Sequence, residues 1–360
     1  MIAEMNAAEP IASRKYAPLS RRLRLGFIPL TDAAPLIVAY EFGSFRKYGL
    51  EVELSREVGW ATIRDKIIYG ELEGAHALGS MVLSTVLGLN CQPTPCLTAC
   101  ILNQNGNAIT LSEDLWKRGV RDAQTFREQV GVSKRTRPLV FGVVYPYSTH
   151  RILLSEWLRS CGVDPDRDVR IVVVPPPQLY RNLAAGTIDG YCAGEPWNAL
   201  AVQKKAGWIV ATSADVSVGH PEKVFMVRSS FAENHHAEHM GLIKGLLEAA
   251  ELCEQPAFQP ELCRLLSQPG YLNVSETIIA QSLIGPLDRG HGEGKTGSAR
   301  HIRFHGNGVN DPTPALATWL MERMQRHGLF PSGIQIPPDL ARRTFRSDLF
   351  HQARARETQA

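Results

Sequence analysis

The chain has 360 residues, of which 44% are hydrophobic and 21% are charged, a composition typical of a folded globular protein and not of a disordered one. Its net charge of +3 is too small to indicate a nucleic-acid partner, and no stretch approaches the roughly 20 consecutive apolar residues of a membrane span. A chain of this length is sufficient for two domains, each with its own core.

The first third of the chain alternates predicted strands and helices. Gly49 and Gly70 close the two helical segments, as glycine commonly does at a helix C-terminus. Strands that alternate with helices predict βαβ units in a parallel sheet. In chain order, a strand at 22–30 precedes a helix at 36–49, a strand at 50–54, a helix at 62–70 and a strand at 72–78.

The same order recurs 116 residues later. The run GTIDGYCAGEPW at 186–197 repeats the pattern of GELEGAHALGSM at 70–81, and Gly142 stands opposite Gly26. The recurrence predicts a second lobe with the layout of the first. Its strands are expected at 138–146, 169–174 and 188–194, with helices at 151–162 and 179–186.

The remainder of the chain is rich in predicted helices and reads as an extension of the first lobe. The chain would then cross between the lobes twice, near 135–138 and near 229–239. We therefore expect an α/β fold with a flexible segment at 1–22 and a ligand cleft between two lobes. Lobe I would comprise 23–135 plus 240–350, and lobe II would comprise 136–239.

Two of the corners that follow predicted strands offer a wall for a small ligand. Trp60 is either a packing residue or a flat apolar surface with one N–H donor. The equivalent corner in the second copy, Pro175 to Pro177, lacks N–H groups and has a restricted backbone, so it would be stiff and poor in donors. Such corners suit a preformed site.

Three polar residues have two readings each. His150 follows Ser148 at a predicted helix start, so it is either a surface residue beside a cap or a donor directed into the cleft. Lys223 precedes an apolar run and is either solvated or a cation in the cleft. Asn107 lies in an Asn-Gly-Asn turn pattern, and its amide could also bind a planar oxyanion.

Neither the cysteines nor the histidine cluster predicts a metal site. The chain has seven cysteines, an odd number that favours a reducing compartment over a disulfide framework. The spacings in the run 91–100 match no zinc or cluster pattern, so buried free thiols are expected. The run HHAEH at 235–239 lacks the order of a zinc motif and is expected to be an exposed helix start or hinge.

Six motifs in order carry a resemblance to a known family. They are VGWATIRDKIIYGELEGAHAL, NQNGNAITLS, STHR, VVVPPPQ, CAGEPWN and HPEKVF. Together they resemble the nitrate- and bicarbonate-binding solute receptors, which have the type II periplasmic-binding-protein fold. The resemblance extends from about Leu23 to Trp319.

The resemblance implies a nitrate pocket without a metal or other cofactor. Relatives have glutamine where this chain has Asn107, which shortens one arm of the pocket. Bicarbonate receptors of the family pair an acid with calcium where nitrate receptors have lysine, and Lys223 stands at that position. The implied ligand residues are Trp60, Asn107, His150, Pro175, Pro176, Gly194, Glu195 and Lys223.

The resemblance also implies a role outside catalysis. The first residues of the chain contain no apolar stretch typical of a secretion signal, so a cytoplasmic protein is expected. In this family that points to the nitrate/nitrite sensor of the assimilation system. The sensor holds an RNA-binding antiterminator of the ANTAR type and releases it when the anion binds.

Two other functions are compatible with the same fold. One is the nitrate-binding receptor component of an ABC transporter. The other is an enzyme, because pyrimidine-precursor synthases share the lobe plan, but their cysteine-rich iron motif and any nucleophile–base pair are absent from this sequence.

Overall fold

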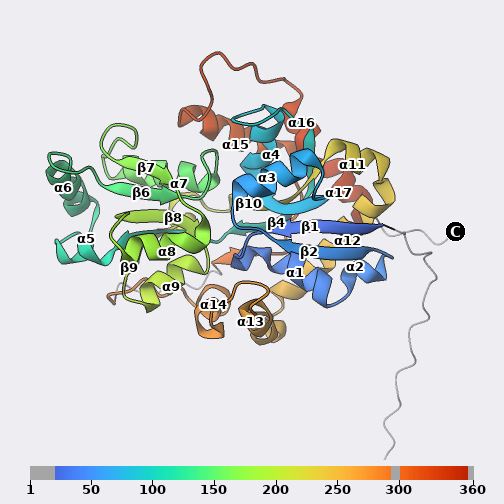
Figure 1. The fold of residues 1–360 in the computed structure, drawn as a ribbon, viewed down its shortest axis with the longest axis horizontal. Helices are drawn as coiled ribbons and strands as arrows, with labels where there is room; N and C mark the ends of the chain where they lie inside the picture. Colours follow the sequence, from blue (N-terminus) through green and yellow to red (C-terminus); the bar gives the residue numbers. More distant parts are fainter. Residues whose placement is uncertain (1–20, 293–300, 356–360) are drawn as a thin grey trace, which may run out of the picture.

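Two mixed β-sheets lie at the centres of two lobes in the computed structural model, which describes residues 21–292 and 301–355 (Figure 1). The first sheet has the strand order β11-β4-β10-β3-β1-β2, and the second has the order β7-β6-β8-β5-β9. The first contains β1 (Arg22–Phe27), β2 (Glu51–Arg56), β3 (Gly74–Leu78), β4 (Cys96–Asn105), β10 (Pro221–Arg228) and β11 (Ile302–Arg303). The second contains β5 (Asn107–Ser112), β6 (Val140–Val143), β7 (Arg170–Val173), β8 (Gly190–Gly194) and β9 (Gly207–Thr212).

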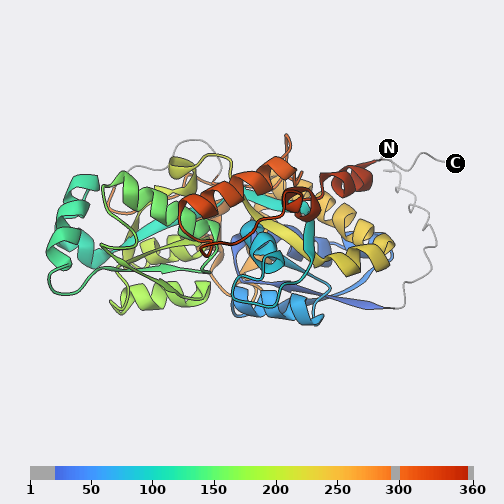
Figure 2. The same ribbon diagram turned by 90° about the horizontal axis from the view of Figure 1, so that it is seen from above.

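Helices cover both faces of each sheet (Figures 1 and 2). On the first lobe lie η1 (Thr31–Ala33), α1 (Ala34–Glu41), α2 (Ser44–Lys47), α3 (Trp60–Tyr69), α4 (Gly79–Val86), α11 (Ser229–Asn234), α12 (His236–Glu254), η2 (Pro256–Phe258), α13 (Gln259–Ser267), α14 (Glu276–Leu283), α15 (Pro314–Arg326), α16 (Leu340–Thr344) and α17 (Ser347–Arg354). On the second lie α5 (Glu113–Lys117), α6 (Ala123–Ser133), α7 (Thr149–Ser160), α8 (Pro176–Ala184), α9 (Trp197–Gln203) and α10 (Ser213–Val216). None of the helices in the described ranges is both long and apolar enough to span a bilayer.

The internal repeat predicted from the sequence is present in the structure. Strands β3 and β8 are offset by 116 residues at both ends, and the register of β1 on β3 (Leu25 opposite Gly74) recurs in β6 on β8 (Phe141 opposite Gly190). A side chain at Gly26 would come within 2.8 Å of Ile63 of α3, and one at Gly142 within 2.7 Å of Leu179 of α8. Both glycines therefore allow a helix to pack closely on the sheet.

The acidic residue shared by the two repeated phrases has the same role in each lobe. Glu73 accepts a hydrogen bond from the backbone N–H of Arg24 at 2.7 Å, and Asp189 accepts one from Val140 at 2.7 Å. Each carboxylate also pairs with an arginine just before the same strand, Arg21 before β1 and Arg137 before β6. The acid thus fixes the start of β1 or β6 against the loop before β3 or β8.

The lobe boundaries predicted from the sequence are wrong. The chain passes to the second sheet at Gly106, which has a φ of +92° and joins β4 directly to β5. It returns between α10 and β10, because β10 pairs with β3 and β4 of the first sheet. Residues 107–135 therefore belong to the second lobe, and residues 221–239 belong to the first. Both β5 and β10 are inserted antiparallel to their neighbours in the sheets. The sequence pattern of such a strand is the same beside any partner, so it does not indicate which sheet the strand joins.

The C-terminal part of the chain also connects the lobes, in two places. After α14 the backbone carbonyl of Arg289 accepts a hydrogen bond from Ile209 of β9 at 2.9 Å, and His291 stacks on Trp116 with ring centroids 3.9 Å apart. Helix α15 lies across the junction of the lobes in Figure 2, where Arg323 pairs with Glu156 of α7. Any movement of one lobe against the other therefore affects these contacts.

Several minor expectations can also be compared with the structure. Residues 1–20 of the predicted flexible segment lie outside the described residues, and Arg22 already belongs to β1. All seven cysteines are free thiols, and all but the half-buried Cys91 are buried, as predicted. The run at 235–239 does lie at the start of α12, but the prediction that this run is exposed is wrong for His239, which is fully buried.

Asp189→Asn tests the role of the repeated acid. The variant keeps the size of the side chain but removes the charge that Val140 N–H and Arg137 contact, so we expect a loss of about 1–3 kcal/mol in the free energy of unfolding. Asp114→Asn is the control, because that exposed carboxylate pairs with the exposed Arg118 and its loss should cost less than about 1 kcal/mol. Urea unfolding followed by circular dichroism measures both, and equal losses would contradict the assignment.

Candidate functional site

A cluster of buried polar residues lies where the carboxyl ends of the parallel strands of both lobes meet. The Thr31 N–H of the first lobe donates to the Glu195 carbonyl of the second at 2.8 Å. A side chain at Gly194 would lie 3.3 Å from the Asp32 carboxylate and 3.5 Å from the Asn107 amide oxygen. The absence of a side chain at Gly194 therefore lets the corners of the two lobes come together.

Lys223 is fully buried and carries two ion pairs. Its Nζ lies 2.8 Å from Asp32 Oδ2 and 2.9 Å from Glu222 Oε1, and both carboxylates are also buried. Burial alone would raise the pKa of Asp32, but the Lys223 charge and a hydrogen bond from His76 outweigh it and bring that pKa to about 2. Burial opposes the charge of Lys223 in turn, yet the two carboxylates leave its pKa raised.

The two ion pairs show how the charge of Lys223 is compensated. A buried lysine needs a nearby negative charge, which a bound anion or a carboxylate can provide. In the structure Asp32 and Glu222 provide that charge. Glu222 directly precedes Lys223 in the HPEKVF motif. Asp32 lies at the corner after β1, and its proximity to Lys223 depends on how β10 inserts beside β3.

Two histidines extend the cluster from opposite lobes. His76 on β3 contacts Asp32 Oδ1 through Nε2 at 2.8 Å, while its Nδ1 lies 3.5 Å from the Ile28 N–H. His150 is the second residue of α7, whose N-terminus Ser148 caps. Its Nδ1 is 3.6 Å from Glu222 Oε1, and burial lowers its pKa to about 4. The surface reading of His150 is therefore wrong.

Several other buried polar groups around this cluster lack a hydrogen-bond partner among the described residues. Trp60 begins α3, and its ring centre is 5.6 Å from Lys223 Nζ. Asn107 begins β5 opposite Gly194. Unpaired buried donors are costly, so such a group indicates a place for a bound polar molecule. The unpaired atoms include Trp60 Nε1, both amide atoms of Asn107, both ring nitrogens of His150, Thr149 Oγ1 and Ser80 Oγ.

The remaining sequence-predicted residues fall into two groups. Glu195 is fully buried, and burial raises its pKa to about 7. Its Oε1 lies 3.7 Å from Nε2 of His301, a residue that the sequence analysis did not identify. Pro176 begins α8 at the position equivalent to Trp60, and Pro175 is the N-cap of that helix. Neither is among the described residues that pair with Lys223.

The predicted division of the site between the lobes is partly reversed. Asn107 was placed with lobe I and Lys223 with lobe II, but β5 belongs to the second sheet and β10 to the first. Trp60 and Lys223 therefore lie on one lobe, and Asn107 and His150 on the other. Within the described ranges, no group of three or more His, Cys, Asp or Glu side chains is arranged to hold a metal ion.

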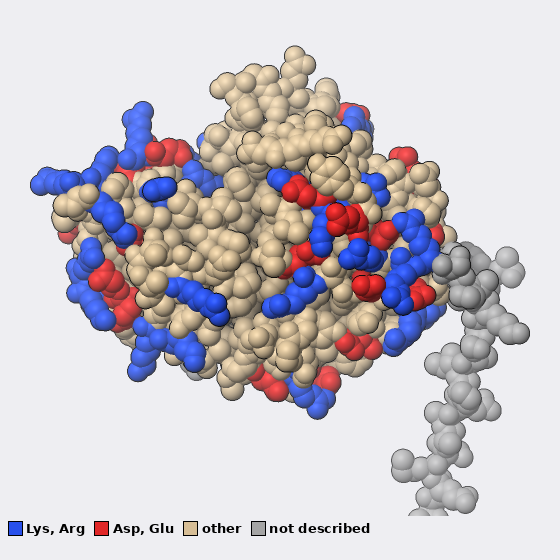
Figure 3. All heavy atoms as spheres, viewed as in Figure 1, with Lys and Arg blue, Asp and Glu red and all other residues tan. Residues whose placement is uncertain are grey.

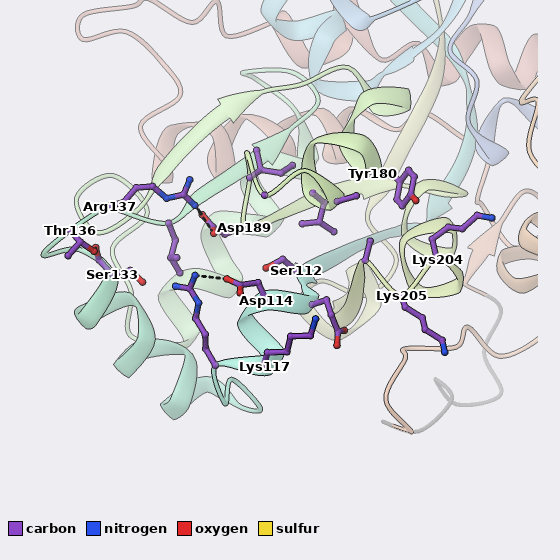
Figure 4. Close-up of a pocket in the computed structure, with 18 residues that line it drawn as sticks. Ser112, Asp114, Lys117, Ser133, Thr136, Arg137, Tyr180, Asp189, Lys204 and Lys205 are labelled. Atoms are coloured by element: carbon purple, nitrogen blue, oxygen red, sulfur yellow. Dashed lines mark hydrogen bonds and ion pairs between the residues drawn. The ribbon is translucent and has the colours of Figure 1, made fainter.

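A hollow of about 710 Å³ lies elsewhere, at the amino ends of β6 and β8 (Figure 4). Lys117, Tyr180 and Lys204 are among its lining residues. Arg137, which also lines it, already forms an ion pair with Asp189. Basic side chains also gather along the outer surface of this lobe (Figure 3). The hollow shares no residue with the cluster around Lys223, and its arginines already have partners, so we do not assign the site to it.

Comparisons with known proteins agree on the family and the fold. Residues 17–267 match the model of the NMT1-like family. The crystal structure of the periplasmic nitrate-binding protein NrtA from Synechocystis PCC 6803 superimposes with a TM-score of 0.87 at 28% identity, covering 94% of this chain and 89% of that one. The predicted two-lobed periplasmic-binding-protein fold is thus confirmed.

Sequence relatives are named for nitrate and for bicarbonate. The nitrate import ATP-binding protein NrtC of Synechocystis and the bicarbonate transport ATP-binding protein CmpC of Synechococcus elongatus are each 37% identical over 92% of this chain. The chain spans 49% of the length of each of these two relatives. The nitrate/nitrite binding protein NrtA of Synechococcus elongatus is 33% identical, with 94% of this chain and 78% of that protein covered.

Buried histidines should make the fold sensitive to acid. Burial lowers the pKa of His150 and His301 to about 4 and that of His239 to about 3, whereas an unfolded histidine titrates near 6.5. The unfolded chain therefore binds more protons below pH 6.5. Stability is fully present above that pH and is lost as the pH falls toward 4, by about 1.4 kcal/mol per pH unit for each histidine.

His239→Leu tests this dependence away from the candidate site. Neither ring nitrogen of His239 has a partner among the described residues, so leucine should be tolerated. Urea unfolding at about pH 7, 6 and 5 should show a smaller loss of stability in the variant, by roughly 0.7 kcal/mol from pH 7 to 6 and about 1.2 kcal/mol from pH 6 to 5. An unchanged slope would contradict a neutral His239 in the folded protein.

Proposed function

Because the chain belongs to the NMT1-like family and has the fold of a nitrate-binding receptor, we propose that it binds a small oxyanion, nitrate or nitrite, between its lobes. The observation that supports this most directly is the set of unpaired buried donors around Lys223. An indole N–H, an amide and an imidazole converge there from both lobes. A ligand in this position would contact both lobes at once and would favour their closed arrangement.

The chemistry of nitrate fits these donors. Nitrate is planar, carries one charge and accepts hydrogen bonds without donating any. Trp60 Nε1 and the Asn107 amide can donate to it, and Thr149 and Ser80 offer hydroxyl groups. Nitrite satisfies the same donors with one oxygen fewer.

Bicarbonate is the competing ligand, because CmpC is as similar to this chain as NrtC is. Bicarbonate carries one O–H donor, and Glu222 Oε2 has no hydrogen-bond partner among the described residues, so it could accept that proton. Against this, the motif resemblance associates bicarbonate with calcium and an acid at the position of Lys223. The site proposed here has the lysine and is expected to bind without calcium.

Calorimetric titration with nitrate, nitrite and bicarbonate tests the proposal. We expect saturable binding of nitrate and nitrite that a calcium chelator does not weaken. Asn107→Ala should lower nitrate affinity by about tenfold or more, because a hydrogen bond to a charged group contributes about 1.5–3 kcal/mol. Asn234→Ala is the control, since Asn234 is exposed at the end of α11. Lys223→Ala is a poorer test, because it leaves two buried carboxylates unpaired.

Two results would contradict this proposal. Binding of bicarbonate that requires calcium, with none of nitrate, would place the chain with the bicarbonate receptors. Equal loss of affinity in Asn107→Ala and Asn234→Ala would remove Asn107 from the site.

As to biological role, we propose that this protein is the receptor component of a transport system and not an enzyme. The relatives named above are binding and transport proteins, which supports this role more than that of a regulator. The cytoplasmic sensor that releases an ANTAR-type antiterminator remains a prediction from the motifs alone.

A pull-down of an ANTAR-type antiterminator with and without nitrate distinguishes the two roles. A sensor should hold the antiterminator without nitrate and release it with nitrate, and the partner should weaken nitrate binding by the same factor. Asn107→Ala should then retain the partner at nitrate concentrations that release it from the unaltered protein. The absence of a complex, or a complex that requires nitrate, would exclude the sensor role and leave the receptor.

A further inference from the structure

The buried cluster has one excess negative charge before any anion enters. Asp32 and Glu222 are ionised, because the net shift of each pKa is downward, and Lys223 supplies a single positive charge between them. All three side chains are inaccessible to water. A nitrate ion bound here would add a second uncompensated negative charge in a medium where charges interact strongly. The following inference rests on the proposed binding of an oxyanion.

One group in the cluster is placed to remove that charge. His150 Nδ1 lies 3.6 Å from Glu222 Oε1, and both of its ring nitrogens are unpaired among the described residues. The charged or titratable groups that act on it are Glu222 and Lys223 of β10, Asp32 of η1 and His220 before β10. A protonated His150 could face the carboxylate with one N–H and a bound anion with the other.

The other titratable groups are less suited to this role. His76 contacts Asp32 through Nε2, and the Ile28 N–H approaches its Nδ1, which is the pattern of a neutral ring. His220 Nδ1 lies 3.3 Å from the Pro221 carbonyl and 3.4 Å from Glu222 Oε2, so its N–H already has acceptors in β10. His220 is the nearest rival to His150, and the variant His220→Gln separates the two. Glu195 is largely protonated at pH 6, because burial raises its pKa to about 7, so it has little capacity left to accept a proton there.

We propose that the site takes up one proton together with its anion and that His150 holds this proton. The proton comes from solvent and no bond to the anion is formed. The protein would thus take up one nitrate ion and one proton per site. The nitrate occupies the pocket, and the proton is held on His150. The protonation of His150 would then control whether an anion can bind, because the added positive charge compensates the anion beside the two carboxylates.

The direction of the pH dependence follows from linkage. In the empty site the pKa of His150 is about 4, and a neighbouring anion raises it. Between these two pKa values the complex binds one more proton than the free protein does, so the dissociation constant for nitrate rises about tenfold for each unit of pH. Above the pKa of the complex, binding becomes weak and independent of pH.

Calorimetry at about pH 6 in two buffers with different ionisation enthalpies counts the protons directly. The unaltered protein should take up close to one proton per nitrate, and its dissociation constant should rise about tenfold from pH 5.5 to 6.5. In His150→Gln the uptake should vanish and the dissociation constant should change by less than about twofold over that range. Glu195→Gln and His220→Gln are the matched controls and should retain the uptake.

Each outcome bears on the proposal. Nitrate binding without proton uptake in the unaltered protein would overturn it while leaving the proposed function intact. Uptake that persists in His150→Gln but disappears in a control variant would overturn the assignment to His150. Failure to bind nitrate in any buffer would overturn the proposed function and this inference together. The buffer comparison on the unaltered protein decides whether a proton is taken up even if His150→Gln does not fold.

Discussion

The structure of the site depends on the ion pairs of one buried lysine. Removing an ammonium group from water costs several kcal/mol, and Lys223 remains charged because Asp32 and Glu222 lie within 3 Å of it. The second oxygen of Asp32 holds His76 on β3, and Asp32 itself packs against Gly194 of the other lobe. The lysine therefore fixes the corner after β1, the end of β3 and the contact between the lobes, and it sets the charge that any ligand meets.

The two lobes share the same framework of strands and helices, but the residues at the loops that follow the strands differ between them. The two lobes share an offset of 116 residues, the same strand register and the same acid-to-backbone hydrogen bond, which are features of packing. At equivalent corner positions the residues are unlike: Asp32 corresponds to Ser148, Trp60 to Pro176 and His76 to Cys192. The frame is conserved between the lobes because each must pack helices on a sheet. The corners differ because, in addition to any packing they provide, their residues form the candidate site.

The C-terminal part of the chain contributes to this site as well as to the first lobe. After α14 it contacts β9 of the second lobe, and it returns to the first sheet through β11. His301, just before β11, lies close to Glu195 as a result. Helix α15 adds a second connection through Glu156 of α7. Any movement of one lobe against the other is thus coupled to chain segments far from the two crossings between the sheets.

The sequence by itself determined the elements, the repeat and most of the corners, because strand alternation, helix period and glycine positions are local properties of the chain. It placed Trp60, His150 and Lys223 among the candidates, and the structure brings these residues into one cluster. Only the tertiary structure decided which sheet receives β5 and β10, since an antiparallel strand has the same pattern beside any neighbour. That choice brings Asp32 to Lys223 across 191 positions of sequence, and with it the charge balance of the site. Such a contact cannot be inferred from spacing, because it arises from the packing of segments that are distant in the chain.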